Sequence, residues 1–214
     1  AYTTIDNPAQ YFNTVIYAGT GSSHAITVGF QPDWVWIKNR DAGNDHNSYD
    51  SIRGATKDLN NNTSNAESTI AEGLKSFDSN GFTVGTNTAH NSGNENFVSW
   101  NWLAGGTASS NTDGSITSSV SANTTAGFSI VSYTGSGSNA TVGHGLSSAP
   151  SMIIFKARGT GNWLVYHQGI GNTHGVFLNT TSAKDDDATY FQDTNPTSSV
   201  FSIGISTLVN DTNP

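Results

Sequence analysis

The sequence has no cysteine and few charged residues. Lys and Arg number eight and Asp and Glu sixteen, so charged residues make up 11% of the chain, against about 25% in an average domain. The absence of cysteine excludes disulfides, thiolate metal sites and cysteine nucleophiles. With scattered basic residues and a formal net charge of −8, we expect no binding to nucleic acid or anionic membranes. The longest apolar run, around 152–155, is too short to span a bilayer.

Gly, Ser, Thr and Asn take the place of the missing charge, and aromatic residues make up 10% of the chain. Thr and Ser suit a pleated, exposed sheet surface, whereas Asn and Gly suit turns. The aromatic content argues against disorder, because disordered chains are poor in aromatics. This composition therefore predicts an all-β protein.

An internal repeat organises the chain. Residues 12–21 match residues 128–137 at an offset of 116, and residues 29–40 match 145–158 with two additional residues in the second copy. Further matches join 59–60 to 178–179 and 82–85 to 201–204. Repeats in constant order indicate two copies of one structural unit. We expect two antiparallel β-sandwich units of jelly-roll or lectin-like packing, at 1–105 and 127–214, joined by a Gly/Ser/Thr-rich linker at 106–126 that is in part a strand.

The second copy ends where the first continues into its last strand. Copy one closes with residues 97–103, and copy two reaches Pro214 at the matching point. A sandwich that lacks one strand has an unpaired edge and an open core. We expect the natural chain to continue past Pro214; the alternative is that another segment or subunit fills the gap.

Short runs of β-branched and aromatic residues between turns predict the strands. In residues 96–103 the side chains alternate, and one face carries Trp100 and Trp102. Trp34 and Trp36 share a face in the same way, and we expect all four indoles to lie in the core, because each buries a large area. Residues 64–75 are read as a short helical turn or an excursion between strands. The remaining predicted strands are 12–17, 24–30, 34–38, 47–52, 56–59 and 82–85.

Several of these motifs resemble a known module. They are Gly29-Phe-Gln-Pro-Asp-Trp-Val-Trp-Ile-Lys-Asn-Arg40, residues 49–57, residues 76–82 and Trp100-Asn-Trp102, with related forms at 143–150 and 196–201. Together they are similar to a repeat module of marine bacteriophage tail-fibre-like and other structural proteins, which resembles concanavalin A-like (jelly-roll) lectin domains. The resemblance covers nearly the whole chain. It implies a virion setting and carbohydrate binding, and it brings no catalytic or ligand residues with it.

Two groups of side chains are candidates for ligand binding. Trp163 follows a turn and precedes Tyr166 and His167, so an exposed aromatic surface for the apolar face of a sugar is one interpretation, and packing in the core is the other. The second group mixes acceptors, donors and an aromatic ring, as a glycan hydroxyl requires; its alternative is a structural ion pair made by the arginine. Its members are Asp45, His46, Tyr49, Asp50 and Arg53.

Metal binding and catalysis have weaker signals. Asp185, Asp186 and Asp187 are weak calcium candidates, because calcium prefers several carboxylate oxygens from one loop, although a charge run is usually a solvated loop. No other cofactor is indicated, and no histidine pair has the spacing of a helical zinc site. Glycoside hydrolysis needs two carboxylates near one another, but the three glutamates do not alternate with aromatics along a strand. We therefore assign no catalytic residue.

The function predicted from these observations is non-catalytic binding of host-surface carbohydrate by a phage virion appendage. The expected partners are a host glycan, other virion proteins and further copies of the chain, a homotrimer being the usual assembly of such appendages; nucleic acid and membrane insertion are not expected. The predicted location is the virion surface, outside the cell. The alternatives are a purely structural virion protein, such as a capsid decoration or tail scaffold, and a polysaccharide depolymerase.

Overall fold

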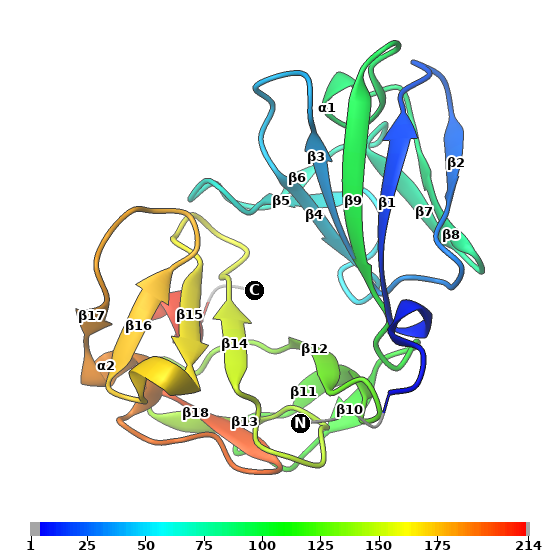
Figure 1. Cartoon of the computed structure of the whole chain (residues 1–214). Coiled ribbons are helices and arrows are strands. Elements are labelled where there is room, and N and C mark those ends of the chain that lie inside the picture. The colour runs from blue at the N-terminus through cyan, green and yellow to red at the C-terminus, as the bar shows by residue number, and fades with distance from the viewer. Residues whose placement is uncertain (1–4, 213–214) are drawn as a thin grey trace. The chain divides into compact units, whose positions relative to one another are not determined.

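The computed structural model describes residues 5–212, which form strands, turns and a few single-turn helices (Figure 1). This confirms the predicted all-β class. The chain divides into two compact units. Unit 1 comprises Ala1–Asn60 and Ser68–Thr107, and unit 2 comprises Asn61–Glu67 and Ala108–Pro214. Within 5–212, no helix has the length and apolarity needed to cross a membrane.

Unit 1 contains two antiparallel sheets. The larger has the order β1-β9-β3-β4-β5-β6 and the smaller the order β2-β8-β7. A short 3₁₀-helix η1 (Pro8–Gln10) precedes the first strand, and α1 (Thr88–Asn91) precedes the last. The strands are β1 (Phe12–Ala18), β2 (His24–Thr27), β3 (Trp34–Asn39), β4 (Asn47–Asp50), β5 (Lys57–Asn60), β6 (Ser68–Thr69), β7 (Leu74–Asp78), β8 (Gly81–Val84) and β9 (Asn96–Trp102).

The core of unit 1 is one apolar cluster to which both sheets contribute. The larger sheet supplies Tyr17, Val35, Ile37, Tyr49 and Phe97, and the smaller sheet supplies Ile26, Leu74, Phe82 and Val84. Two sheets that share one buried apolar layer make a sandwich. The segment predicted as a helical turn or excursion, 64–75, contains β6 and the start of β7. A turn separates them, with the Gly73 N–H donating to Ile70 O.

Unit 2 has smaller sheets. Their orders are β10-β11-β12, β14-β15-β16-β17 and β13-β18. The helices are η2 (Gln168–Ile170), α2 (Ala188–Phe191) and α3 (Thr207–Asn210). The strands are β10 (Ser109–Asn111), β11 (Ser118–Asn123), β12 (Phe128–Ser132), β13 (Ala140–Gly143), β14 (Met152–Phe155), β15 (Leu164–His167), β16 (His174–Phe177), β17 (Asp185–Asp186) and β18 (Val200–Ile203).

The residues predicted as a linker, 106–126, are largely paired in unit 2. They contain β10 and β11, and β11 pairs with β12. Segment 61–67 also groups with unit 2. There Arg158 makes two hydrogen bonds to the carboxylate of Glu67, Nη2 to Oε1 at 2.6 Å and Nε to Oε2 at 3.0 Å. The unit 2 core includes Val142, Phe155, Leu164, Tyr166, Tyr190, Phe191, Phe201, Ile203 and Val209.

Matched positions of the two units make the same hydrogen bonds. The hydroxyl of Tyr17 donates to His90 O at 2.7 Å, and that of Tyr133 donates to Val209 O at 2.6 Å. The side-chain amide of Asn91 donates to Ser22 O and Gly85 O, and that of Asn210 donates to Ser138 O and Gly204 O. These shared bonds support the internal repeat read from the sequence.

Candidate binding face

Strand pairing brings four tryptophans together on the larger sheet of unit 1. Neighbouring strands β1, β9 and β3 (Figure 1) align Phe12 with Trp102 and Trp102 with Trp34. Two positions along, Trp100 lies opposite Trp36. Side chains two apart on a strand share a face. The four indoles and Phe12 therefore form one surface, which we call the tryptophan face.

The tryptophan face is the outer face of the sheet, so the expectation that these indoles lie in the core is wrong. The alternate residues Val35, Ile37 and Phe97 are fully buried in the cluster shared with the second sheet. The four indoles are half-buried, and Phe12 is 39% exposed. Both faces of β3 are apolar, so alternation alone could not decide which one meets the second sheet.

The polar side chains on β9 explain why the sequence-based prediction of its core-facing side was wrong. Ser99 and Asn101 alternate with the indoles and looked solvent-facing, yet both are 0% exposed. The Asn101 side-chain amide donates to Asn13 O at 3.0 Å and to Ser99 Oγ at 3.0 Å. Hydrogen bonds of this kind offset the cost of burying an amide. The inward face of β9 can therefore be polar while its outward face is aromatic.

The rings of the tryptophan face contact each other in a continuous series. The centroids of Trp34 and Trp102 are 4.3 Å apart in a stacked arrangement, and Phe12 lies 4.9 Å from Trp102. Trp36 is 6.0 Å from Trp34 and 5.8 Å from Trp100, the latter edge to face. Rings this close to one another attract each other. The face is thus an ordered aromatic surface.

Hydrogen bonds to β4 and the turn before it fix two of the indoles. The Trp34 N–H donates to Ser48 Oγ at 2.6 Å, and the Trp36 N–H donates to His46 Nδ1 at 2.9 Å. An indole N–H only donates, so Nδ1 of His46 is the acceptor and its proton is on Nε2. Burial lowers the pKa of His46, and the nearby Lys38 charge lowers it further. His46 is therefore a neutral acceptor at pH 7.

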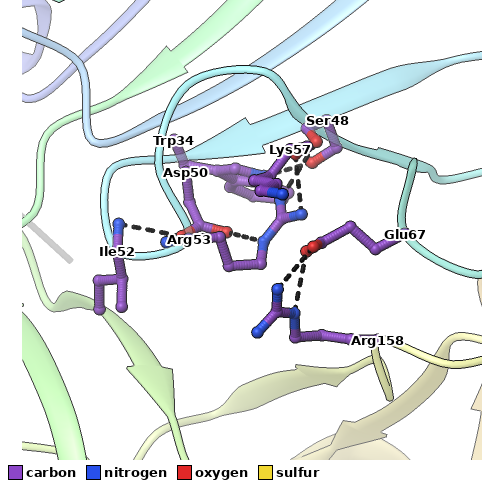
Figure 2. A network of polar contacts seen from close by, with 8 residues as sticks. All are labelled: Trp34, Ser48, Asp50, Ile52, Arg53, Lys57, Glu67 and Arg158. Atoms are coloured by element: carbon purple, nitrogen blue, oxygen red, sulfur yellow. Dashed lines mark hydrogen bonds and ion pairs between the residues drawn. The ribbon is translucent and has the colours of Figure 1, made fainter. Parts of the chain in front are cut away.

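Arg53 and Asp50 border the tryptophan face as an ion pair (Figure 2). Arg53 Nε donates to Asp50 Oδ2 at 2.5 Å, while its other nitrogens donate to Lys57 O at 2.9 Å and Ser48 O at 3.2 Å. The two side chains are 10% and 11% exposed. Asp50 Oδ1 also accepts the Arg53 backbone N–H at 2.8 Å. These contacts correspond to the structural alternative for this pair.

The second predicted group of side chains, which includes His46, Tyr49, Asp50 and Arg53, does not converge on one surface. Tyr49 is 0% exposed and lies in the core. Its hydroxyl lies 2.8 Å from His90 Nε2, and His90 Nδ1 lies 2.9 Å from Asn87 Oδ1. Because the amide oxygen only accepts, His90 carries its proton on Nδ1 and Tyr49 donates to Nε2. Of the group, His46 contacts the tryptophan face through its ring, which accepts from and packs against Trp36.

The predicted aromatic site of the second copy is buried. Trp163 is 5% and Tyr166 3% exposed, and Tyr166 packs edge to face on Phe191 at 5.5 Å. The expectation of an exposed aromatic surface here is therefore wrong, because β15 turns this ring into the apolar cluster. His167 is exposed, and its Nδ1 accepts the N–H of Gly169 at the start of η2.

The three calcium candidates have separate local roles. Asp185 Oδ2 accepts from the Tyr190 hydroxyl at 2.7 Å, and Asp187 Oδ1 accepts the Thr189 N–H that starts α2. Asp186 lies 3.6 Å from the ring of His174. Among residues 5–212, no three His, Asp or Glu side chains gather as metal ligands would.

The glutamates are engaged in structural contacts. Glu67 pairs with Arg158, and Glu72 accepts from Lys75 Nζ at 3.0 Å. Glu95 accepts from the side-chain amide of Asn39 at 2.6 Å. The tryptophan face, in contrast, offers indole surfaces held in place by neutral acceptors. Such a surface is suited to binding an apolar or amphipathic ligand rather than to proton transfer.

Comparison with known proteins gives one relationship. The sequence profile of a family described as a domain of unknown function, DUF7483, matches residues 7–214. This match covers both units, including the tryptophan face. No curated protein and no solved structure is similar enough to count as a match. On the extent of the profile match, the chain belongs to the DUF7483 family.

Proposed function

We propose that this protein is a non-catalytic binding module that holds carbohydrate on the tryptophan face. The observation that carries the proposal is the outward, half-buried array of Trp34, Trp36, Trp100 and Trp102. The C–H face of a sugar ring is apolar and stacks on an indole. Ordered aromatic surfaces also bind at low entropic cost, because their rings are already fixed.

The layout of the face favours a ligand with several sugar rings. The Trp102–Trp34 pair lies two residue pairs along the sheet from the Trp100–Trp36 pair, with the Val35–Asn101 pair between them. Positions two apart on a strand are about 6.6 Å apart, so the two pairs offer neighbouring stacking positions. Each site would be weak by itself, and many copies on one virion appendage would raise the overall affinity. The resemblance of the repeat to phage tail-fibre-like modules supports that setting.

The proposal is tested by a glycan-array screen of the whole chain, followed by calorimetry with the glycans that bind. Trp100→Thr and Trp34→Ala should each weaken binding at least about tenfold, because each removes one stacking surface. The matched control is Met152→Ala. Met152 takes the place of Trp34 in the second copy and is 50% exposed, so affinity should not change. Equal affinity of the wild type and both tryptophan variants would contradict the proposal.

A second candidate function is docking of another virion protein on the same face. The apolar surface continues beyond the indoles to Ile16, which is 64% exposed and lies opposite Val98. Contiguous exposed apolar surfaces often mark protein contacts. Under this alternative, Ile16→Asp would disrupt assembly measured by light scattering and leave any glycan binding intact. The depolymerase alternative is tested on the same glycans by measuring new reducing ends.

A further inference from the structure

Strand β1 forms one edge of the larger sheet of unit 1. Within residues 5–212 it pairs with β9 alone. Beyond its two ends, the Leu103 N–H donates to Tyr11 O and the Gly19 N–H donates to Glu95 O. Opposite residues in an antiparallel ladder alternate between bonded and non-bonded pairs, so the odd-numbered residues of β1 bond to β9. The even-numbered residues, 12 to 18, therefore direct their backbone N–H and C=O groups away from the sheet.

β1 lacks the features that usually keep a free edge from pairing with another chain. Natural sheets protect their edges with charged side chains, proline, bulges or very short strands. The opposite edge strand, β6, has two residues, and the edge strand β7 of the smaller sheet carries Lys75 at a register shift. β1 runs for seven residues in continuous register, without charge or proline. On its outward face Phe12 is 39% and Ile16 64% exposed.

The matched edge of unit 2 holds a further strand. β12, the counterpart of β1, pairs with β11. Ile116, just before β11, bridges Val142 on the side of β13 that is not paired with β18, and Ser118 Oγ donates to Gly143 O at 3.1 Å. Because β13 is the counterpart of β2, β11 lies along the outer side of the repeat. The fold thus accommodates an additional strand at the edge that β1 leaves free within residues 5–212.

We propose that two copies of this protein associate through β1, which pairs antiparallel with β1 of the second copy across a two-fold axis. A two-fold contact requires a surface that complements itself. With the axis at Thr14, the even-numbered residues oppose each other, and Phe12 of each copy lies opposite Ile16 of the other. Aromatic and β-branched side chains stabilise a sheet as cross-strand pairs. The three opposed pairs exchange about six ladder hydrogen bonds.

The charge of β1 suits contact between identical chains. Each copy has a formal net charge of −8, so two copies repel each other wherever their acidic surfaces meet. The only ionisable side chain of β1 is that of Tyr17, which is buried and donates its hydroxyl proton to His90 O. Pairing at β1 therefore places no like charges opposite one another. A basic partner protein, by contrast, finds no carboxylate on this strand.

The dimer joins the two larger sheets into one. Opposed residues of an antiparallel pair point to the same side of the sheet, so both tryptophan faces lie on one surface. Phe12, whose ring is 4.9 Å from that of Trp102, lies beside the axis and links the two faces. A glycan chain that spans the axis contacts both faces and gains from their linkage. This consequence rests on the proposed function, whereas the pairing of β1 does not.

The first test is sedimentation velocity of the whole chain at several concentrations. The Thr14 N–H points away from β9, and proline is tolerated on an edge strand where the N–H faces outward. Thr14→Pro should therefore raise the dissociation constant of the dimer at least about tenfold, because it removes edge donors at the axis. The control Thr14→Val keeps the N–H and should leave the dimer unchanged. Thermal unfolding of both dilute variants checks that they fold.

The second test uses the absence of cysteine from the chain. Thr14→Cys places one thiol from each copy across the axis, where opposed Cα atoms of a bonded pair lie about 5.5 Å apart. A disulfide spans that separation. Mild oxidation should therefore give a covalent dimer at least about ten times faster than in the control Ser68→Cys, whose thiol lies on the exposed strand β6.

Three outcomes would overturn the proposal. The first is a wild-type chain that stays monomeric at about 0.1 mM. The second is an assembly that Thr14→Pro leaves intact although the variant is folded, which would place the contact elsewhere. The third is equal rates of disulfide formation in the two cysteine variants. Glycan binding by a monomeric chain would leave the proposed function standing, so either proposal can fail alone.

Discussion

The indole N–H of Trp36 donates to Nδ1 of His46 at 2.9 Å, and the two rings meet edge to face at 5.7 Å. This single bond joins β3 to the turn before β4 and holds one ring of the tryptophan face in place. It also requires that His46 be unprotonated at Nδ1. The order of the face is thereby linked to the titration of one side chain.

We predict that acid loosens the tryptophan face. Burial and Lys38 lower the folded-state pKa of His46, so the unfolded chain binds a proton first as pH falls below about 6.5. Above that pH, His46 is neutral in both states and the bond contributes its full stabilisation. That stabilisation decreases as the pH falls from about 6.5 through the lower folded-state pKa of His46. Tryptophan fluorescence should change over this interval in the wild type, and His46→Phe should remove the change. An identical titration in the variant would contradict the assignment.

Unit 1 should also lose stability in acid through His90. Burial lowers the pKa of His90 from 6.5 to about 4, so between these values only the unfolded state binds the proton. The titration of His90 therefore leaves the free energy of unfolding unchanged above pH 6.5 and lowers it by up to about 3 kcal/mol as the pH approaches 4. Urea denaturation at pH 7 and pH 4.5 measures the loss, and in His90→Gln the difference between the two should be smaller.

The hydroxyl of Tyr49 should contribute to stability through the same network. Tyr49→Phe removes the donor to His90 Nε2 and leaves a buried acceptor without its bond. We expect a loss of about 1–3 kcal/mol in the free energy of unfolding at pH 7. Tyr11→Phe is a comparison at a half-buried position outside the core cluster, and it should change stability by less than about 0.5 kcal/mol. Similar values for the two variants would contradict the role of this network.

The sequence was sufficient for the β class because that class depends on local features. Runs such as Val35 and Ile37 between turn residues predict strands whatever lies opposite. The strand containing Trp100 and Trp102 was predicted, and it is β9. Which face of β9 meets the second sheet depends on long-range pairing. That choice was wrong, because Ser99 and Asn101 find hydrogen bonds inside the sandwich.

The candidate site was harder to predict than the fold, because exposure is set by the tertiary structure. Trp163 follows a turn, and turns are usually exposed, yet the ring is 5% exposed. Tyr49 lies in a polar stretch, but strand alternation directs it inward. In β3 indoles alternate with aliphatic residues, so both faces are apolar and the pattern does not indicate which of them is exposed.

Replacing Asp58 should stabilise the protein at neutral pH. The side chain is 4% exposed, and among residues 5–212 no group hydrogen-bonds to Oδ1. Burial raises the pKa of the carboxyl to about 6. The folded state therefore favours the protonated acid, and stability falls as pH rises from about 3.8 to about 6. Asp58→Asn should raise the free energy of unfolding by about 1–3 kcal/mol at pH 7.5. The variant and wild-type curves should converge near pH 4, and a constant offset at all pH values would refute the reasoning.

The last prediction separates a structural from a ligand-binding role for Arg53. Its guanidinium pairs with Asp50 and also donates to the carbonyls of Ser48 and Lys57. A lysine has one nitrogen and cannot reach all three partners from this position. Arg53→Lys should therefore cost about 1–3 kcal/mol, and Arg53→Met more, because it leaves the Asp50 carboxylate buried without its partner. Double-mutant cycles with Asp50→Asn measure the coupling. If glycan affinity falls while the melting temperature stays the same, Arg53 contacts ligand and the structural assignment is wrong.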